Sequence, residues 1–181
     1  MVRQLFEFDP PERFVAGTVG LPGERQFYLQ ARASGRLVNV AVEKVQVAAL
    51  AERVDEVLLE LRRLGTDVPS PMPAGLVDNA PLDVPIEPDF TCGTLVIAWD
   101  PDAQRVVIEA LAVGDQTGEV VPLTDSDDGP DTLRVHLTAA AAKAFSTRAG
   151  QVVAAGRPDC ILCGQPMDPN GHVCPRSNGH H

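Results

Sequence analysis

The feature that most constrains the fold of this chain is a proline-dense segment near its middle. Residues 65–89 contain six of the sixteen prolines in the sequence. Each proline lacks a backbone N–H and fixes φ, so this density excludes a regular helix or a central strand. The sequence therefore predicts an extended linker at residues 65–89, with a folded half on either side of it.

The half before the linker, residues 1–64, is predicted to contain strands followed by one helix. Alternating segments bounded by turn residues indicate strands at 2–8, 13–19, 26–31 and 37–42. Gly65 is a natural stop for the helix. The predicted helix is amphipathic, with apolar residues at three- and four-residue steps: Val45, Leu50, Val54, Val57, Leu58, Leu61 and Leu64.

The half after the linker, residues 90–155, repeats this order. Strands are predicted at 89–99, 105–111 and 133–137, with an acidic loop at 124–131. Thr138 is placed to cap a helix that begins with a run of alanines. The buried stripe of that helix is predicted to be Phe145, Ala149, Val152 and Val153.

Two F-x-x-G-T motifs, at Phe14–Thr18 and Phe90–Thr94, fall at the start of the two halves. Together with the shared element order, they suggest an internal duplication. We therefore expect an α+β fold: duplicated strand-strand-strand-helix units forming antiparallel sheet or sheets, covered by helices. Gly17 and Gly93 are expected at bulges or close backbone contacts.

The C-terminal segment, residues 156–181, carries a metal-binding pattern, C-x2-C-x8-H-x-C. Its candidate ligands are Cys160, Cys163, His172 and Cys174. Two cysteines two residues apart can bind one ion from a tight turn, and structural zinc takes four Cys or His ligands. Gly164 and the turn at 166–171 would let the chain double back. The sequence therefore predicts a small knuckle around one structural zinc ion.

Several alternatives to this knuckle stay open. His180 or His181 could replace His172 as the fourth ligand, although the terminal histidine pair is also typical of an expression remnant. The cysteines could instead form a redox pair or stay reduced in a loose tail. Catalytic zinc would need an open position and a base, for which Asp159 and Asp168 are candidates by proximity alone.

Charge and composition disfavour several classes of partner. The formal net charge is −10, and residues 65–181 carry all of the excess, with six Arg or Lys against sixteen Asp or Glu. Such a surface repels a phosphate backbone. No apolar run is long enough to cross a membrane, and the N-terminus lacks the pattern of a signal peptide. We therefore expect a cytoplasmic protein that does not bind nucleic acid or membranes.

No catalytic residue is predicted. The sequence has no nucleophile elbow and no phosphate-binding loop, and its acidic loop lacks EF-hand spacing. His136 lies in a predicted strand, where a hydrogen-bonded histidine is the simplest interpretation, and Cys92 is expected to be a small core residue. Five arginines of the first half would make an anion site if one face gathered them: Arg3, Arg13, Arg25, Arg32 and Arg36.

The opening from Val2 to Thr18, the Ala155–Pro158 hinge and the Cys160–Gly164 and Gly171–Arg176 segments together resemble an uncharacterised actinobacterial family. That family is classed as a domain of unknown function and is sometimes labelled a repeat protein. The resemblance covers nearly the whole chain. It implies no activity, substrate or catalytic residue.

From these observations we expect a non-enzymatic, zinc-stabilised binding or adaptor protein that acts on a protein partner. One alternative is an enzyme for a small anionic substrate, bound in a cleft between the halves near Arg25, Arg32 and Arg105. A second is single-stranded nucleic-acid binding. A basic sheet face with Phe27 or Tyr28 exposed would favour that second alternative.

Overall fold

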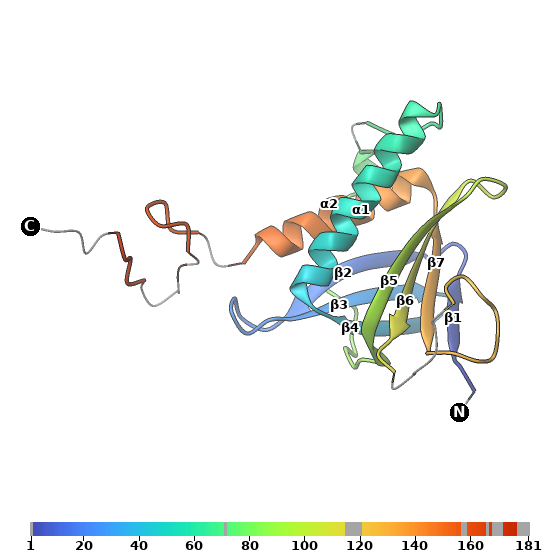
Figure 1. The fold of residues 1–181 in the computed structure, drawn as a ribbon, viewed down its shortest axis with the longest axis horizontal. Helices are drawn as coiled ribbons and strands as arrows, with labels where there is room; N and C mark the ends of the chain where they lie inside the picture. Colours follow the sequence, from blue (N-terminus) through green and yellow to red (C-terminus); the bar gives the residue numbers. More distant parts are fainter. Residues whose placement is uncertain are drawn as a thin grey trace, which may run out of the picture.

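The fold is α+β, with one seven-stranded mixed sheet and two α-helices, as seen in a computed structural model that describes residues 2–70, 72–114, 121–156, 159–165, 167 and 172–176 (Figure 1). The elements follow the predicted order. They are β1 (Leu5–Phe8), β2 (Arg13–Val19), β3 (Gln26–Ala33), β4 (Arg36–Val42), α1 (Lys44–Arg63), the short 3-10 helix η1 (Ala74–Leu76), β5 (Phe90–Asp100), β6 (Arg105–Ala112), β7 (Thr132–Leu137) and α2 (Ala139–Ala154).

The strands lie in the order β1-β7-β6-β5-β4-β3-β2. Neighbours within each half are antiparallel, as predicted. The sheet as a whole is mixed, because β4 pairs with β5 in parallel and β1 pairs with β7 in parallel. Parallel neighbours need a long connection, and the linker supplies it between β4 and β5. The two halves therefore share a single sheet.

The main core lies between the sheet and the two helices. Alternate residues of the central strands face it, such as Leu29 in β3, Val40 in β4 and Ile108 in β6, all of which are buried. The helices pack on each other, with α2 also against β2 and α1 against β5. Phe14 of β2 stacks on Phe145 of α2 with ring centroids 4.5 Å apart, so the core joins both halves.

Local sequence signals explain where the helices begin and end. The Thr138 side chain accepts a hydrogen bond from the Ala141 N–H at 3.1 Å, which confirms the predicted cap of α2. Gly65 follows α1 with a φ of 89°, a backbone conformation that favours glycine. Val45 and Leu64 differ from prediction: both are exposed, since Val45 lies in the first turn and Leu64 follows the last. Neither helix is long and apolar enough to cross a membrane, among the residues described.

The linker is extended but packed. Apart from η1, its described residues form no helix or strand. Leu82 is buried with Val15 and Tyr28 in a second, small apolar cluster. These strand residues point away from the helices, so the linker covers the back face of the sheet in the first half. The prolines exclude ladder pairing while leaving side chains free to pack.

The two glycine motifs do not occupy matching places. If the buried residues Gln30 in β3 and Glu109 in β6 are aligned, their partners Val15 and Val96 are equivalent. In this alignment Gly17 lies two residues after Val15. Gly93 instead lies three residues before Val96, at a bulge between Cys92 and Thr94. The alignment of the F-x-x-G-T motifs is therefore wrong. Duplication of the two halves stays a prediction.

Both glycines nevertheless lie at close contacts, as expected. A Cβ on Gly17 would come within 2.5 Å of Leu82 Cδ2, and one on Gly93 within 3.1 Å of Val113 Cα. At Gly17 the absence of a side chain lets the linker cross directly above the strand, and at Gly93 it lets the backbone that follows β6 approach β5 closely at the bulge.

Candidate metal centre

The first pair of predicted ligands lies in a tight turn beyond the C-terminal end of α2. The Gly164 N–H donates to the Cys160 carbonyl at 2.8 Å, and the Cys160 N–H donates to the Gln165 carbonyl at 2.8 Å. Gly164 has a φ of 73°, which a residue with a side chain adopts only at a cost. The sequence Cys-Ile-Leu-Cys-Gly therefore folds locally into a turn that brings both sulfurs to one side.

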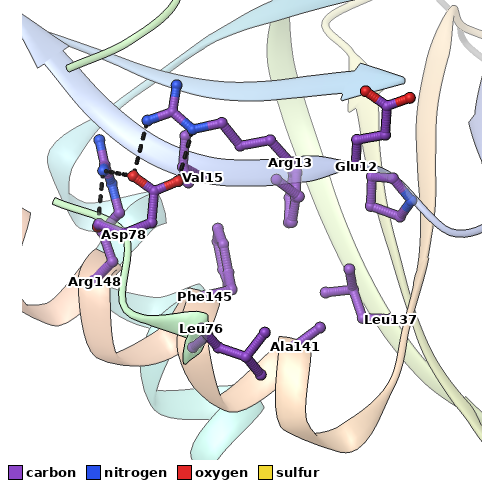
Figure 2. A pocket seen from close by; sticks show the side chains of 12 residues that line it. Glu12, Arg13, Val15, Leu76, Asp78, Leu137, Ala141, Phe145 and Arg148 are labelled. Carbon is purple, nitrogen blue, oxygen red and sulfur yellow. Dashed lines mark hydrogen bonds and ion pairs between the residues drawn. The ribbon is translucent and has the colours of Figure 1, made fainter. Parts of the chain in front are cut away.

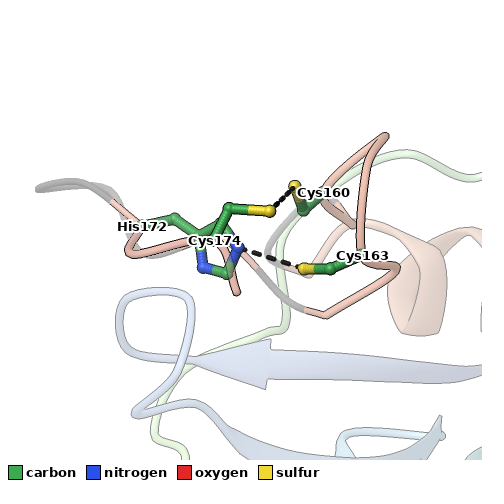
Figure 3. A group of neighbouring side chains, drawn as sticks. All are labelled: Cys160, Cys163, His172 and Cys174. Carbon is green, nitrogen blue, oxygen red and sulfur yellow. Dashed lines mark hydrogen bonds between the residues drawn. The ribbon is translucent and has the colours of Figure 1, made fainter. Parts of the chain in front are cut away.

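The second pair, His172 and Cys174, meets the first across this turn (Figure 3). The four potential ligand atoms all lie within 4.8 Å of one another. Cys160 Sγ lies 3.8 Å from Cys174 Sγ, and Cys163 Sγ lies 3.3 Å from His172 Nε2. Zinc–sulfur bonds of about 2.3 Å place the sulfurs of a tetrahedral site roughly 3.8 Å apart. The cluster therefore has the dimensions of a four-coordinate metal site.

Among the described residues, the histidine that the structure brings to the cluster is His172. Its Nε2 atom faces the Cys163 sulfur (Figure 3). The alternative ligands His180 and His181 lie outside the described residues, as do Asp168 and most of the predicted turn at 166–171. Asp159 is exposed, and its carboxylate is not among the converging atoms.

The local electrostatics favour a metal-binding thiolate at Cys160. Hydrogen bonds from the backbone N–H groups of Cys163 and Leu162 lower the pKa of Cys160 to about 6, against an opposing effect of burial. The Gln165 backbone N–H acts to lower the pKa of Cys163, but burial and the neighbouring cysteines raise it overall. Metals bind the thiolate, so one sulfur of the cluster is already favoured in the binding form.

The remaining cysteine is separate from this centre. None of the four cysteines forms a disulfide. Cys92 is buried in the core, as predicted, and burial raises its pKa to about 11. A raised pKa keeps this thiol neutral and unreactive.

The knuckle exposes apolar side chains around the ligands. Ile161 is 96% exposed, Val173 82% and Leu162 51%. Each lies between two ligands in the sequence, where coordination by its neighbours would hold it outward. The Leu162 carbonyl accepts a hydrogen bond from Arg176 at 3.2 Å, which ties the two arms of the knuckle together.

The arginines suggested as an anion site are dispersed. Arg25 lies over the Phe27 ring and donates to the Val152 carbonyl. Arg36 lies over Phe6 and Phe8, and Arg105 bonds carbonyls of its own hairpin. Of the arginines suggested for an anion site, Arg13 and Arg32 share an ion-pair partner, the carboxylate of Asp83. The suggested pocket of Arg25, Arg32 and Arg105 does not form.

The remaining candidate residues are buried or take part in contacts within the fold. Asp125 of the acidic loop pairs with Arg134 at 2.6 Å and joins no group of potential metal ligands among the described residues. His136 Nε2 is buried 3.5 Å from Glu7 Oε2 without a hydrogen bond, so the expectation of a hydrogen-bonded histidine is not met at that atom. Phe27 and Tyr28 are buried, which removes the feature that would have favoured nucleic-acid binding.

Two buried arginines, Arg134 and Arg148, were not foreseen. Arg134 is paired with the fully buried Glu109 at 2.7 Å, and Arg148 contacts Asp78 of the linker at 3.1 Å. A charged residue inside an otherwise apolar strand or helix stripe was the available signal for both. Their partners come from distant segments, so the pattern alone does not identify them.

Comparison with known protein families places the chain in relation to a described family. The family described as "Protein of unknown function (DUF3090)" matches residues 6–174, a span that includes the sheet except for Leu5, both helices and all four candidate ligands. No curated protein and no solved structure matches the chain.

Proposed function

The chain belongs to the DUF3090 family of proteins of unknown function, and from this premise we propose that it is a zinc-stabilised binding protein whose knuckle contacts a protein partner. The observation that carries the proposal is the convergence of three sulfurs and one imidazole within 4.8 Å, in a segment that exposes Ile161, Leu162 and Val173. The sheet and helices then serve as the rigid base of the knuckle.

The donor set favours zinc. Thiolate and imidazole ligands suit zinc, whereas magnesium and calcium prefer oxygen ligands. The spacing of Cys160 and Cys174, 3.8 Å, fits a tetrahedron and is far longer than a disulfide bond.

The ligand count favours a structural ion. A catalytic zinc keeps one position open for water or substrate, and a structural zinc uses four protein ligands. Here four protein atoms converge, and the nearest carboxylate in sequence, that of Asp159, is not one of them. An ion bound by all four ligands would therefore order the turn and perform no reaction.

The exposed apolar residues favour a protein partner. No charged residue lies between Cys160 and Cys163, or between His172 and Cys174, so these tips have no group to bind a phosphate. Three small tips bury far less than the roughly 1,200 Å² of a stable interface, which argues against self-association through the knuckle alone. They suit insertion into an apolar pocket of a different protein.

Metal analysis tests the first part of this proposal. Untagged protein ending at Asn178 should contain about one zinc per chain, because the four ligands form a closed site. Cys163→Ser should lose that zinc, while the matched variant Cys92→Ser, which alters a core thiol, should keep it. Absence of stoichiometric zinc from the parent protein would contradict the proposal.

Partner capture tests the second part. Ile161→Asp with Leu162→Asp should abolish capture of one specific host protein while the zinc stays bound, because charge opposes burial of these tips. Val2→Asp, a change at another exposed apolar residue, should have no effect. The captured protein must then bind the purified chain directly, and equal binding of both variants would show that the knuckle tips are not the contact.

A further inference from the structure

Two buried arginines from different halves converge on one carboxylate (Figure 2). Arg13, in β2, donates from Nε to Asp78 Oδ2 at 2.7 Å and from Nη2 to Asp78 Oδ1 at 3.1 Å. Arg148, in α2, donates from Nη1 to the same Oδ1 at 3.1 Å. The two arginine side chains are only 9% and 10% exposed. Bidentate binding of this kind is how proteins recognise planar carboxylates.

This place carries positive charge in an acidic protein. Among the described residues, Arg13, Arg32 and Arg148 form ion pairs with two carboxylates, those of Asp78 and Asp83. Burial lowers the pKa of Arg148, and the nearby Arg13 charge acts in the same direction as burial. Two guanidinium groups so close together need an anion between them. The overall charge of the chain is −10, so this local excess does not reflect general composition.

A small pocket begins beside the two arginines. It has a volume of about 130 Å³, and its walls include Phe14 of β2 and Leu137, Ala141 and Phe145 near the start of α2. Figure 2 shows the arginines and Asp78 at one end and Leu137 at the other, with Phe145 and Leu76 between them. The pocket therefore has the two arginines at one end and apolar walls along its length, and Glu12 lies near the Leu137 end.

The carboxylate that fills the charged end belongs to a segment without regular structure beyond η1. Asp78 follows η1, and Leu76 of η1 also lines the pocket while remaining 40% exposed. The segment is held through side-chain bonds to its carbonyls and carboxylates: Arg148 to Asp78 O and Ala80 O, and Arg13 to Ala80 O and Pro81 O. No strand ladder opposes its displacement.

We propose that Arg13 and Arg148 form a carboxylate-binding site which the chain's own Asp78 occupies, and that a small monocarboxylate with a short apolar body competes for it. The carboxylate of the ligand takes the place of the Asp78 carboxylate, and its apolar body lies against the wall that the stacked rings of Phe14 and Phe145 form. Residues 74–80 then leave the pocket, which joins ligand binding to release of this part of the linker. The site is independent of the metal centre.

The pocket selects this class of ligand by size and charge. A volume of about 130 Å³ holds only a few heavy atoms, so a short-chain acid fits where a larger metabolite does not. Glu12 and Asp78 also line the pocket, and a phosphate dianion would bring more negative charge toward them without filling the apolar walls.

The test uses sodium propionate as the probe and sodium chloride at equal ionic strength as the control. Asp78→Ala removes the internal competitor, so it should bind propionate saturably and at least tenfold more tightly than the wild-type chain, measured by calorimetry. Arg148→Met combined with Asp78→Ala should abolish binding. Asp83→Ala is the matched control, since it removes another carboxylate from Arg13 but leaves Asp78, and it should bind like the wild type.

Hydrogen exchange supplies the second measurement. Saturating propionate should speed exchange of residues 74–80 in the wild-type chain and leave α1 unchanged. If Asp78→Ala fails to fold, Asp78→Asn keeps the side-chain shape without the charge and should show the same tighter binding. The proposal is overturned if neither variant binds propionate saturably, or if binding survives the Arg148→Met change.

Discussion

In both halves of the sheet a pair of buried polar side chains holds a segment that crosses the back face, but the chemistry of the pair differs. In each half the back face, away from the helices, carries a buried polar pair on neighbouring strands: Gln30 of β3 opposite Asn39 of β4 in the first half, and Glu109 of β6 opposite Arg134 of β7 in the second. Each pair binds the backbone of the segment that crosses above it. The first pair is neutral, and the second is an ion pair.

The hydrogen bonds match closely. Gln30 Oε1 accepts from the Asp83 N–H at 2.8 Å, and Glu109 Oε2 accepts from the Leu123 N–H at 2.9 Å. Within the pairs, Gln30 donates to Asn39 at 2.7 Å and Arg134 to Glu109 at 2.7 Å. Fixing a covering segment thus requires a buried acceptor at this position, and either an amide or a carboxylate provides it. The cost of losing a partner should differ, because a charge is harder to leave unpaired than an amide.

The largest expected effect is at the charged pair. Arg134→Met would leave Glu109, which is fully buried, without its counter-charge. We expect the free energy of unfolding to fall by about 3–5 kcal/mol, the usual cost of breaking a buried ion pair. Urea denaturation followed by circular dichroism measures it.

The double variant Arg134→Met with Glu109→Leu is the control for this change. It removes both charges and should recover much of the lost stability, because an apolar pair carries no desolvation cost. If Arg134→Met were as stable as the wild type, the ion pair would not be what holds the segment that contains Leu123 and Thr124.

The neutral pair should be less sensitive. Gln30→Leu removes the acceptor of the Asp83 N–H and the donor to Asn39, and we expect a loss of about 1–3 kcal/mol by the same measurement. If Gln30→Leu lost as much stability as Arg134→Met, the two pairs would be equally sensitive. Charge would then add nothing to the free-energy cost of losing a buried partner.

A third prediction concerns the close approach of the linker to β2. Gly17→Ala would place Cβ within 2.5 Å of the buried Leu82 side chain, so the linker must shift, at a cost of about 1–2 kcal/mol. Gly75→Ala, with nothing within 4 Å of its added Cβ, should be nearly neutral. Combining Gly17→Ala with Leu82→Ala should relieve the clash, and continued strain in that double variant would place its source elsewhere.

Acid should loosen both covering segments modestly. The hydrogen bond from Arg13 lowers the pKa of Asp78, and the one from Arg134 lowers the pKa of Asp125. A carboxyl group with a lowered folded-state pKa adds stability above its unfolded value of about 4, and that stability is lost as the pH falls through the folded value.

Unfolding by urea between pH 7 and pH 3 measures this dependence. Asp78→Asn and Asp125→Asn should each flatten it, and Asp78→Asn should do so more. Asp78 is the less exposed carboxyl, 31% against 83%, and it contacts two arginines. The reverse order would show that exposure does not govern these two contacts.

The smallest effect on the sheet should follow metal removal. The described residues of the knuckle contribute nothing to the main apolar cluster, so Cys163→Ser should change the stability of the sheet and helices by less than about 0.5 kcal/mol. Hydrogen exchange should quicken only in residues 159–176. Global unfolding on chelation would instead make the metal part of the main fold.

The sequence by itself determined the elements with local causes. Alternation and three- and four-residue steps located the strands and both helices, Thr138 indicated a cap, and Gly65 a stop. The C-x2-C-x8-H-x-C spacing identified the four residues that converge in the knuckle. These signals are readable because each depends on contacts between residues close in the chain.

Only the tertiary structure decided the long-range contacts. Strand order, the parallel joins at β4–β5 and β1–β7, and the partners of Arg134 and Arg148 link segments that no local pattern connects. The motif alignment of Gly17 with Gly93 failed for the same reason, since register depends on the partner strand and not on the residues themselves. The linker shows the division most clearly: proline excluded regular structure there, but packing of Leu82 and binding of Asp78 made it a cover for the sheet.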